Sequence, residues 1–185
     1  MKIVNMQTLN PEQRIQAAQM LTDELPLGWE TLEEALEEVD ERLDTVERDG
    51  IGESLFLAAV EDGVILGWIG MLPSYGGNVY ELHPLVVRND RQGEGIGTIL
   101  ILELEKAARE RGGLTMHLGA DDEKPGGETS LANVDLYDDL PNYIKNFKSG
   151  THQAAFYMKM GYKIIGVMPD ANGIGKPDIF FGKRL

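Results

Sequence analysis

The stretch VVRNDRQGEGIG, residues 86–97, decides the expected fold. An apolar run ends at Val87, a glycine-rich turn follows, and a helical pattern begins at Gly95. Glycines adopt positive φ angles and let the backbone approach a ligand closely, and the free amides at a helix start attract an anion. The stretch therefore predicts a strand, a turn and a helix whose N-terminus binds a phosphate or pyrophosphate group.

Two common phosphate-binding motifs do not fit this stretch. A P-loop needs a Lys at a fixed place after its glycines, and none stands there. A dinucleotide fingerprint needs glycines spaced GxGxxG, whereas Gly93, Gly95 and Gly97 are spaced GxGxG. The runs before the turn also read as antiparallel strands, which neither half of a Rossmann fold contains.

Hydrophobic periodicity extends the prediction to the whole chain. Strands are expected over residues 1–8, 55–61, 64–72, 79–87, 114–118, 162–168 and 178–182, and helices over 10–24, 31–50, 95–111 and 151–160. This order predicts one domain over residues 1–185, of the α/β (α+β) class, with a mixed and mostly antiparallel sheet flanked by helices.

Short local signals set several of these boundaries. Asn10 with Gln13, and Thr31 with Glu34, are capping-box patterns that predict two helix starts. Val46 is the last apolar position of the second helix, and Gly50 is expected to end it. The dipeptide Asp62–Gly63 is a strong signal for a hairpin.

The charge balance bears on partners. The 185 residues include 17 Lys and Arg against 31 Asp and Glu, a net charge of -14. Such a surface repels nucleic acid and attracts cations, which favours a polycationic small molecule, although acidity can also serve solubility alone. There are no cysteines, and His83, His117 and His152 are far apart, so no metal site is expected.

Targeting signals are not expected in this chain. The first nine residues contain one Lys and no long apolar run, unlike a signal peptide. The longest apolar stretch, Ile96–Leu104, is too short to span a membrane and is interrupted by Glu103. We therefore expect a cytoplasmic protein with no membrane partner.

An acidic insertion over residues 119–150 follows the predicted fifth strand. It shows little periodicity at first, and a loop of this length is usually functional or disordered. Its aromatic residues Tyr137, Tyr143 and Phe147 indicate that part of it packs.

Two motifs resemble those of the GNAT acyltransferases. Gln92-x-x-Gly95-x-Gly97 is similar to the (Q/R)xxGx(G/A) signature of that family, and Phe156-Tyr157-x-x-x-Gly161-Tyr162 resembles a second signature. From Leu55 onward the chain resembles one subgroup, the chromosomal aminoglycoside 6'-N-acetyltransferases of Gram-positive bacteria. The similar segments are residues 81–87, 111–113, 118–122, 129–131, 135–137, 161–167, 170–173 and 176–179. Many members have an Asn where this chain has Gly150, so no coenzyme contact is carried over there.

The resemblance implies an enzyme that transfers acetyl directly from acetyl-CoA, without a metal, to the 6'-amine of an aminoglycoside, in antibiotic resistance. The coenzyme contacts it implies are Leu85, Val86, Val87, Gln92, Gly93, Gly95, Ile96, Gly97, Thr98 and Tyr157.

The resemblance also implies catalytic roles for three residues. Glu81 would accept the amine proton, or else only bind the cationic substrate. The Leu85 amide would stabilise the oxyanion, freed by a strand bulge that Pro84 favours. Tyr157 would donate a proton to the leaving thiolate, or else only pack.

Carboxylates are the expected ligands of a substrate that carries several ammonium groups. The candidate substrate-binding residues are Glu81, His83, Asp121, Asp122, Asp135, Asp139 and Asp178. His83 has the same strand parity as Glu81, so we expect both on one face.

Two alternatives stay open. One is an acetyltransferase of the same fold for another amine, such as a polyamine, a peptide N-terminus or a lysine. The other is a non-catalytic protein that binds acyl-CoA or sequesters polycations. The resemblance also implies a homodimer, and the last strand is the expected edge for pairing.

Overall fold

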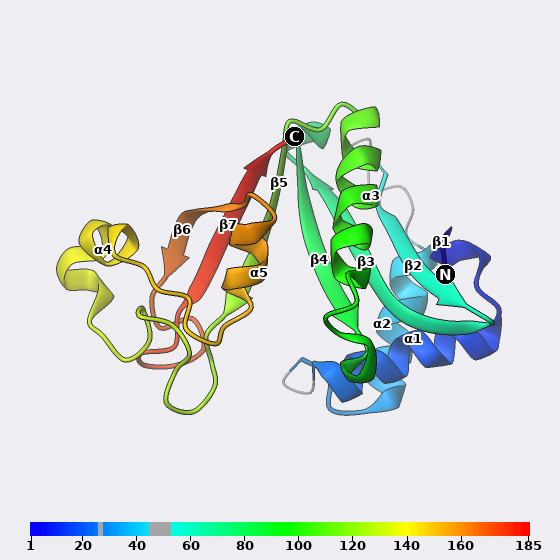
Figure 1. Ribbon diagram of the computed structural model, residues 1–185, viewed down its shortest axis with the longest axis horizontal. Coiled ribbons are helices and arrows are strands. Elements are labelled where there is room, and N and C mark those ends of the chain that lie inside the picture. Colours follow the sequence, from blue (N-terminus) through cyan, green and yellow to red (C-terminus); the bar gives the residue numbers. More distant parts are fainter. Residues whose placement is uncertain (26–27, 45–52) are drawn as a thin grey trace. The chain divides into compact units, whose positions relative to one another are not determined.

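The computed structural model describes residues 1–25, 28–44 and 53–185 (Figure 1). The predicted helix position Val46 and the predicted helix end at Gly50 lie outside the described residues. The chain divides into two compact units, Met1–Met116 with Leu185, and His117–Arg184.

In the described part of the first unit, four antiparallel strands pair in one order and three α-helices flank them. The strands are β1 (Lys2–Asn5), β2 (Leu55–Glu61), β3 (Val64–Ser74) and β4 (Val79–Val87), paired in that order. The helices are α1 (Pro11–Glu24), α2 (Leu32–Asp44) and α3 (Ile96–Glu110). The hairpin predicted at Asp62–Gly63 is confirmed, since both residues have positive φ angles between β2 and β3.

Both predicted capping boxes are confirmed. The Asn10 side chain accepts a hydrogen bond from the Gln13 amide at 2.9 Å, and the Gln13 side chain accepts one from the Asn10 amide at 3.2 Å. Thr31 and Glu34 exchange the same pair of bonds, each 3.2 Å long. These side chains satisfy amides that the first helical turn leaves without partners.

The first strand is shorter than the sequence predicts. It ends at Asn5 rather than Thr8, because the Asn5 side chain accepts a hydrogen bond from the Gln7 amide at 2.9 Å. That bond starts a short 3₁₀ helix, η1 (Met6–Thr8). A local side-chain bond thus replaces strand pairing, as asparagine commonly favours.

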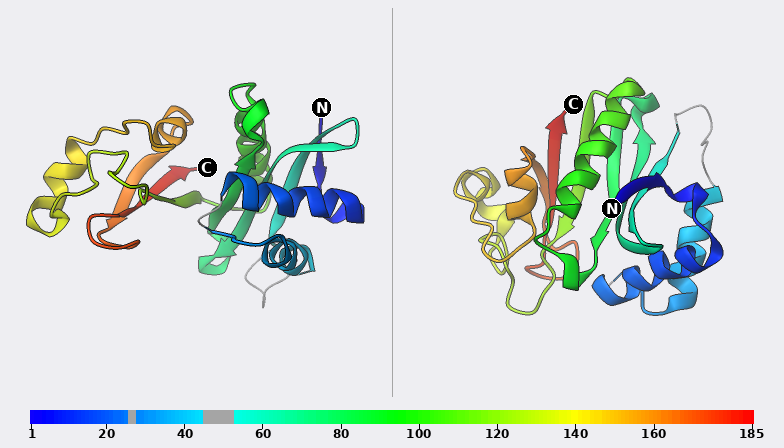
Figure 2. Two further views of the ribbon diagram at one scale, coloured as in Figure 1. Left: turned by 90° about the horizontal axis from the view of Figure 1, so that it is seen from below. Right: turned by 45° about the vertical axis from the view of Figure 1, so that its right-hand side comes forward.

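Helices cover both faces of β3. The Trp68 indole donates a hydrogen bond to the Ala17 carbonyl of α1 at 3.1 Å. The neighbouring Gly67 faces the other way, where an added Cβ would lie 3.3 Å from the Ile96 side chain of α3. Figure 2 shows α1 and α2 on one side of these strands and α3 on the other. This double cover explains why β3 is a nearly continuous buried apolar run.

The second unit holds three strands in the order β5-β7-β6. They are β5 (Thr115–Asp121), β6 (Lys163–Met168) and β7 (Asp178–Arg184), and two helices, α4 (Leu136–Lys145) and α5 (Ala154–Lys159), accompany them. The edge of this order is β6, so the expectation that the last strand is an edge was wrong. Strand β7 comes last in the chain but returns between β5 and β6.

The mostly antiparallel strands with flanking helices confirm the predicted fold class. The acidic insertion is only partly irregular. Helix α4 forms within it, and the Asp135 side chain caps α4 by accepting a hydrogen bond from the Tyr137 amide at 3.0 Å.

Candidate active site

The turn between β4 and α3, residues 88–98 and called here the coenzyme turn, has the geometry of an anion site. Gly93 and Gly95 have φ angles of 81° and 84°, and apart from the adjacent residues no atom of the described chain lies within 4 Å of a Cβ built at either position. The first hydrogen bond of α3 runs from the Ile99 amide to the Gly95 carbonyl. The amides of residues 96–98 therefore precede the helical ladder, and Gly95 has no side chain to cap them.

Side-chain bonds fix the first half of the coenzyme turn. The Gln92 amide group donates to the Val87 carbonyl at 3.0 Å and to the Asn89 side-chain oxygen at 3.1 Å. Gln92, the first residue of the family signature, thus ties the turn to the end of β4. A short 3₁₀ helix, η3 (Asn89–Arg91), lies between them.

Carboxylates neutralise both arginines of the coenzyme turn. Arg88 donates two hydrogen bonds to Asp90, at 2.9 and 2.8 Å, and Arg91 lies 2.9 Å from Glu94 and 3.3 Å from Glu61. Each pairing raises the pKa of the arginine, and the Arg88 bond lowers the pKa of the exposed Asp90 carboxyl. The attraction of this turn for an anion therefore comes mainly from backbone amides and the α3 dipole.

A bulge interrupts β4 next to the predicted catalytic residues, as the sequence analysis expected at Pro84. Leu82 pairs with Met71 and Leu85 pairs with Ile69, so two residues of β4 oppose one residue of β3. A bulge of this kind disrupts the ladder locally and re-aims the residues on either side of it. It provides the setting in which the Leu85 amide was predicted to act.

Glu81 and His83 are both half-buried on β4, and Glu81 lies opposite Leu72 of β3. The His83 ring lies 6.3 Å from the ring of Trp29, between centroids, at 45°. Trp29 is half-buried in the segment between α1 and α2. The sequence analysis missed this residue, although a tryptophan between two predicted helices was a visible signal.

Tyr157 is buried in an aromatic cluster of the second unit. Its ring centroid lies 5.4 Å from that of Phe156, 6.1 Å from Tyr162 and 6.3 Å from Phe181. Burial raises the pKa of the Tyr157 phenol well above its ordinary value of 10.0. The side chain is therefore a neutral hydroxyl at neutral pH, and burial makes it a weaker proton donor than a free phenol.

Asp122 is fully buried and holds a loop of the acidic insertion. One carboxylate oxygen accepts a hydrogen bond from the Glu128 amide and the other from the Thr129 amide, both at 2.8 Å. The Asp122 amide donates to the Pro177 carbonyl at 2.9 Å. These bonds give Asp122 a structural task that the sequence analysis did not foresee.

The neighbouring Asp121 is exposed and lies on the same side of β5 as Gly119. An added Cβ at Gly119 would lie 2.8 Å from a carboxylate oxygen of Asp178, so Asp178 of β7 lies over this position. The structure therefore brings Asp121 and Asp178 to one face of the second unit. Asn172 donates a hydrogen bond to the Asp121 carboxylate, which fixes its direction.

His152 connects the end of β5 to the start of α5. Its Nδ1 accepts a hydrogen bond from the Ala154 amide at 3.2 Å, so Nδ1 carries no proton. Its Nε2 therefore donates to the Asp121 carbonyl at 3.0 Å. The side chain is 3% exposed, and its two hydrogen bonds hold the first turn of the helix that carries Tyr157.

Asp135 and Asp139 are exposed and serve α4. Asp135 caps the helix, and Asp139 accepts a hydrogen bond from the Asn142 amide at 3.3 Å at a kink. Among the described residues no group of three or more His, Cys, Asp or Glu side chains could hold a metal ion. Within the same residues no helix has the length and apolar character needed to cross a membrane.

Comparisons with known proteins identify the family of the chain. The sequence model of the acetyltransferase (GNAT) family matches residues 16–125. No curated protein matches the chain.

Three solved structures are similar over 100% of this chain and 97% of their own chains. An aminoglycoside 6'-N-acetyltransferase complexed with coenzyme A is 37% identical, with a TM-score of 0.89. The aminoglycoside 6'-N-acetyltransferase from Enterococcus faecium is 37% identical, with a TM-score of 0.86. An aminoglycoside 6'-acetyltransferase type Ii is 33% identical, with a TM-score of 0.74.

Proposed function

Because the chain belongs to the GNAT acetyltransferase family, we propose that it transfers the acetyl group of acetyl-CoA to the 6'-amine of an aminoglycoside. The observation that carries the proposal is the full-length similarity to aminoglycoside 6'-N-acetyltransferases, one of them complexed with coenzyme A. The acidic chain, with a net charge of -14, suits a substrate with several ammonium groups.

In this proposal the coenzyme turn holds the pyrophosphate of acetyl-CoA. The open backbone at Gly93 and Gly95, and the amides of residues 96–98, support this role. Leu85, Val86 and Val87 of β4 line the path of the pantetheine arm through their backbone. No metal takes part.

Glu81 accepts the proton of the substrate ammonium group, directly or through one water. The amine nitrogen then forms a bond to the acetyl carbon, and the Leu85 amide stabilises the oxyanion. The carbon–sulfur bond breaks, and Tyr157 donates its hydroxyl proton to the leaving thiolate. The nitrogen loses its second proton to solvent, Glu81 releases the first proton to solvent, and Tyr157 takes one proton back from solvent. The net products are an amide, the free coenzyme thiol and one proton.

Side chains of this acidic chain are the proposed ligands of the aminoglycoside. The candidates are Glu81 and His83 on β4, and Asp121 on β5 with Asp178 on β7, and their carboxylates would give charge-assisted hydrogen bonds to ammonium groups. Trp29 offers an aromatic face for a sugar ring beside His83. Asp135 and Asp139 are further candidate ligands, and Asp122 holds the loop after Asp121.

Release of thiol from acetyl-CoA tests the reaction. The purified protein would be mixed with aminoglycosides that have a free 6'-amine, and with close analogues that have a hydroxyl at that position. Spermidine and a lysine peptide complete the panel. We expect thiol release with the 6'-amino compounds alone.

Each other outcome contradicts part of the proposal. Release with spermidine or the peptide alone would mean an acetyltransferase for another amine. Binding of acetyl-CoA without release across the panel would favour a non-catalytic acyl-CoA-binding protein. Binding of aminoglycosides without any acetyl-CoA binding would favour a polycation-sequestering protein.

A role in antibiotic resistance, a cytoplasmic location, a homodimer and a single domain over residues 1–185 stay predictions of the sequence analysis. The role in resistance is checked by expressing the protein in a sensitive bacterial strain. Expression should raise the concentration of a 6'-amino aminoglycoside that is needed to inhibit growth. Light scattering of the purified protein checks the homodimer.

A further inference from the structure

We propose that Glu24 is a positioning residue for the coenzyme turn, which it holds from helix α1 in the arrangement that binds acetyl-CoA. The inference rests on the proposed role of that turn in holding the pyrophosphate. No sequence motif marks Glu24, which is the last residue of α1.

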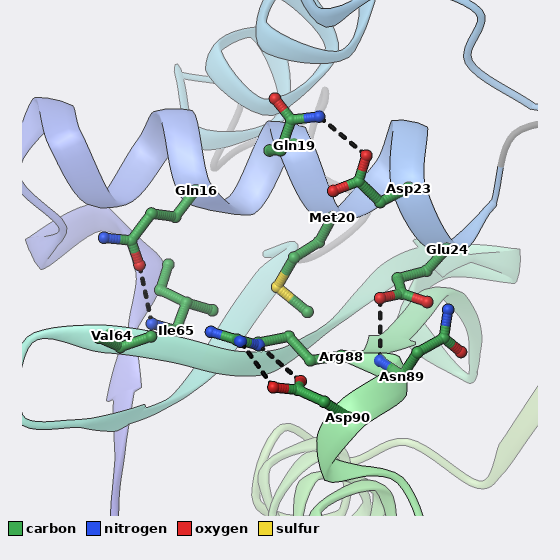
Figure 3. A pocket seen from close by; sticks show the side chains of 10 residues that line it. All are labelled: Gln16, Gln19, Met20, Asp23, Glu24, Val64, Ile65, Arg88, Asn89 and Asp90. Carbon is green, nitrogen blue, oxygen red and sulfur yellow. Dashed lines mark hydrogen bonds and ion pairs between the residues drawn. The ribbon is translucent and has the colours of Figure 1, made fainter.

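The contact joins two segments that lie 65 residues apart in the chain. Oε1 of Glu24 accepts a hydrogen bond from the Asn89 amide at 2.9 Å. Figure 3 shows the Glu24 carboxylate at the end of α1, directed at the Asn89 nitrogen. A bond to an ionised acceptor is stronger than one between neutral groups.

The Asn89 amide needs an acceptor from outside its own turn. Asn89 is the first residue of η3, in which the amides of Arg91 and Gln92 bond back to the carbonyls of Arg88 and Asn89. An amide at the start of such a turn has no partner within it. The Glu24 carboxylate supplies that partner.

Asn89 also connects Glu24 to Gln92, the first residue of the family signature. The Asn89 side-chain oxygen accepts a hydrogen bond from Gln92 at 3.1 Å, and Gln92 also bonds to the Val87 carbonyl. Glu24, Asn89 and Gln92 thus form a continuous chain of hydrogen bonds. It runs from helix α1 to the residue that directly precedes the glycines of the coenzyme turn.

The position of Glu24 is unfavourable for helix stability alone. A negative side chain at a helix C-terminus opposes the helix dipole. Its second oxygen, Oε2, is buried and has no hydrogen-bond partner among the described residues. Arg88, which lines the same pocket, donates two hydrogen bonds to Asp90 and also attracts the Glu24 carboxylate electrostatically. The bond from the Asn89 amide is the hydrogen bond that holds the Glu24 carboxylate to the coenzyme turn.

Loss of the bond should lower coenzyme affinity rather than the rate of chemistry. If some molecules lose the binding arrangement of the turn, only the remaining fraction can bind the coenzyme. The apparent affinity for the coenzyme then falls in proportion to that remaining fraction. Leaving the Asn89 amide without a partner is costly enough to shift that balance about five- to tenfold. Glu24 touches no reacting group, so kcat at saturating acetyl-CoA should be unchanged.

The test compares substitutions at two adjacent residues of α1. Glu24→Ala removes the acceptor, Glu24→Gln keeps a side-chain oxygen in its place, and Asp23→Ala is the matched control. Asp23 and Glu24 both line a pocket of about 540 Å³ next to α1, but Asp23 bonds to Gln19 within its own helix (Figure 3). Calorimetry with coenzyme A gives Kd, and initial rates give kcat and both KM values.

We expect Glu24→Ala to raise the Kd for coenzyme A and the KM for acetyl-CoA about five- to tenfold. Its kcat and its KM for the amine should stay within about twofold. Glu24→Gln should restore most of the affinity, and Asp23→Ala should match the wild type. A KM increase confined to acetyl-CoA distinguishes positioning from general loss of fold, which would lower the active fraction instead.

Three results would overturn the inference: an unchanged Kd in Glu24→Ala, the same Kd increase in Asp23→Ala, or no rescue by Glu24→Gln. Gly95→Val separates this failure from failure of the proposed function. If Gly95→Val abolishes coenzyme binding and Glu24→Ala does not affect it, only the role of Glu24 is wrong. If Gly95→Val binds coenzyme A as the wild type does, the proposed role of the coenzyme turn is wrong.

Discussion

Strands β4 and β5 each lead into a connection for which we propose a function, but the two connections are built differently. After β4, residues 88–98 form a short turn whose proposed function depends on backbone amides and positive-φ glycines. The acidic insertion of residues 119–150 begins in the last residues of β5, and its proposed function depends on carboxylate side chains. A backbone site is encoded by residues next to one another in the sequence, whereas a side-chain site depends on which residues the tertiary structure buries.

Adjacent residues of the second connection illustrate this dependence. Asp121 and Asp122 have the same side chain, yet Asp121 is exposed and Asp122 is fully buried with two backbone donors. No local pattern distinguishes a ligand from a structural anchor here. Experiments that separate backbone from side-chain roles can therefore test the comparison directly.

The largest effect is expected for Glu81→Gln, which keeps the size of the side chain and removes its basicity. We expect kcat to fall by about 10²–10³-fold, because the substrate ammonium group must lose a proton before attack. The Kd for coenzyme A should be unchanged. Initial rates at saturating substrates and calorimetry measure the two quantities. An equal loss of kcat and coenzyme affinity would remove Glu81 as the base.

Next is Gly95→Val, which tests the backbone site. A β-branched residue at a φ of 84° is strained and places a side chain where the turn is open, so coenzyme affinity should fall by about 100-fold. Gly63→Val is the matched control, since Gly63 has a φ of 83° in the β2–β3 hairpin. Calorimetry with coenzyme A should show the loss only in Gly95→Val. Equal affinities in the two variants would argue against a backbone anion site.

The pair Asp122→Ala and Asp121→Ala tests the side-chain connection. Asp122→Ala leaves two amides without their charged acceptor, so the free energy of unfolding should fall by about 2 kcal/mol. Asp121→Ala should change it by less than about 0.5 kcal/mol, as is usual for exposed residues. Its main effect should be a higher KM for the aminoglycoside. Urea unfolding and initial rates measure the two effects. A large loss of stability in Asp121→Ala, with a higher KM only in Asp122→Ala, would mean that the anchoring and ligand roles are exchanged.

The smallest effect is expected for Tyr157→Phe, because a thiolate leaves readily without help. We expect kcat to fall by about three- to fivefold, with the same pH profile between pH 6 and about 9. The raised pKa keeps the Tyr157 phenol protonated throughout that range. A new ionisation in the wild-type profile that the variant lacks would contradict this assignment.

The same pKa shift has a consequence for stability. In the unfolded chain Tyr157 ionises near pH 10, whereas in the folded chain burial keeps it neutral at that pH. The stability that the neutral form contributes is therefore present below pH 10 and is lost as the pH rises above it. Urea unfolding at pH 8 and pH 10.5 should show a smaller loss for Tyr157→Phe than for the wild type.

Local signals explain which parts of the structure could be predicted from the sequence. Strand β4 begins and ends where the apolar run predicted, at Val79 and Val87, and both capping boxes form. The bulge expected near Pro84 is present. These features depend on contacts within a few residues or on one adjacent strand.

Contacts between distant segments explain what the sequence did not reveal. The bond from Glu24 to Asn89 and the approach of Trp29 to His83 join segments more than 50 residues apart. The place of β7 between β5 and β6 is likewise a matter of topology, which no periodicity in β7 encodes. The burial of Asp122 follows from the path of the whole loop around it.

The bulge in β4 shifts the phase of the strand by one residue. On one side of the bulge, the odd-numbered His83 faces Trp29. Trp29 packs against a hydrophobic cluster formed by buried residues of α1, α2 and the strands, among them Leu21, Val39 and Trp68. After the bulge, the even-numbered Val86 belongs to that same cluster. Deleting one residue at the bulge would restore one-to-one pairing with β3 and leave Val86 opposite Trp68, on the face that it already occupies. A single-codon deletion there would thus keep inside and outside unchanged for the end of β4, so the packing of this strand does not depend on the extra residue.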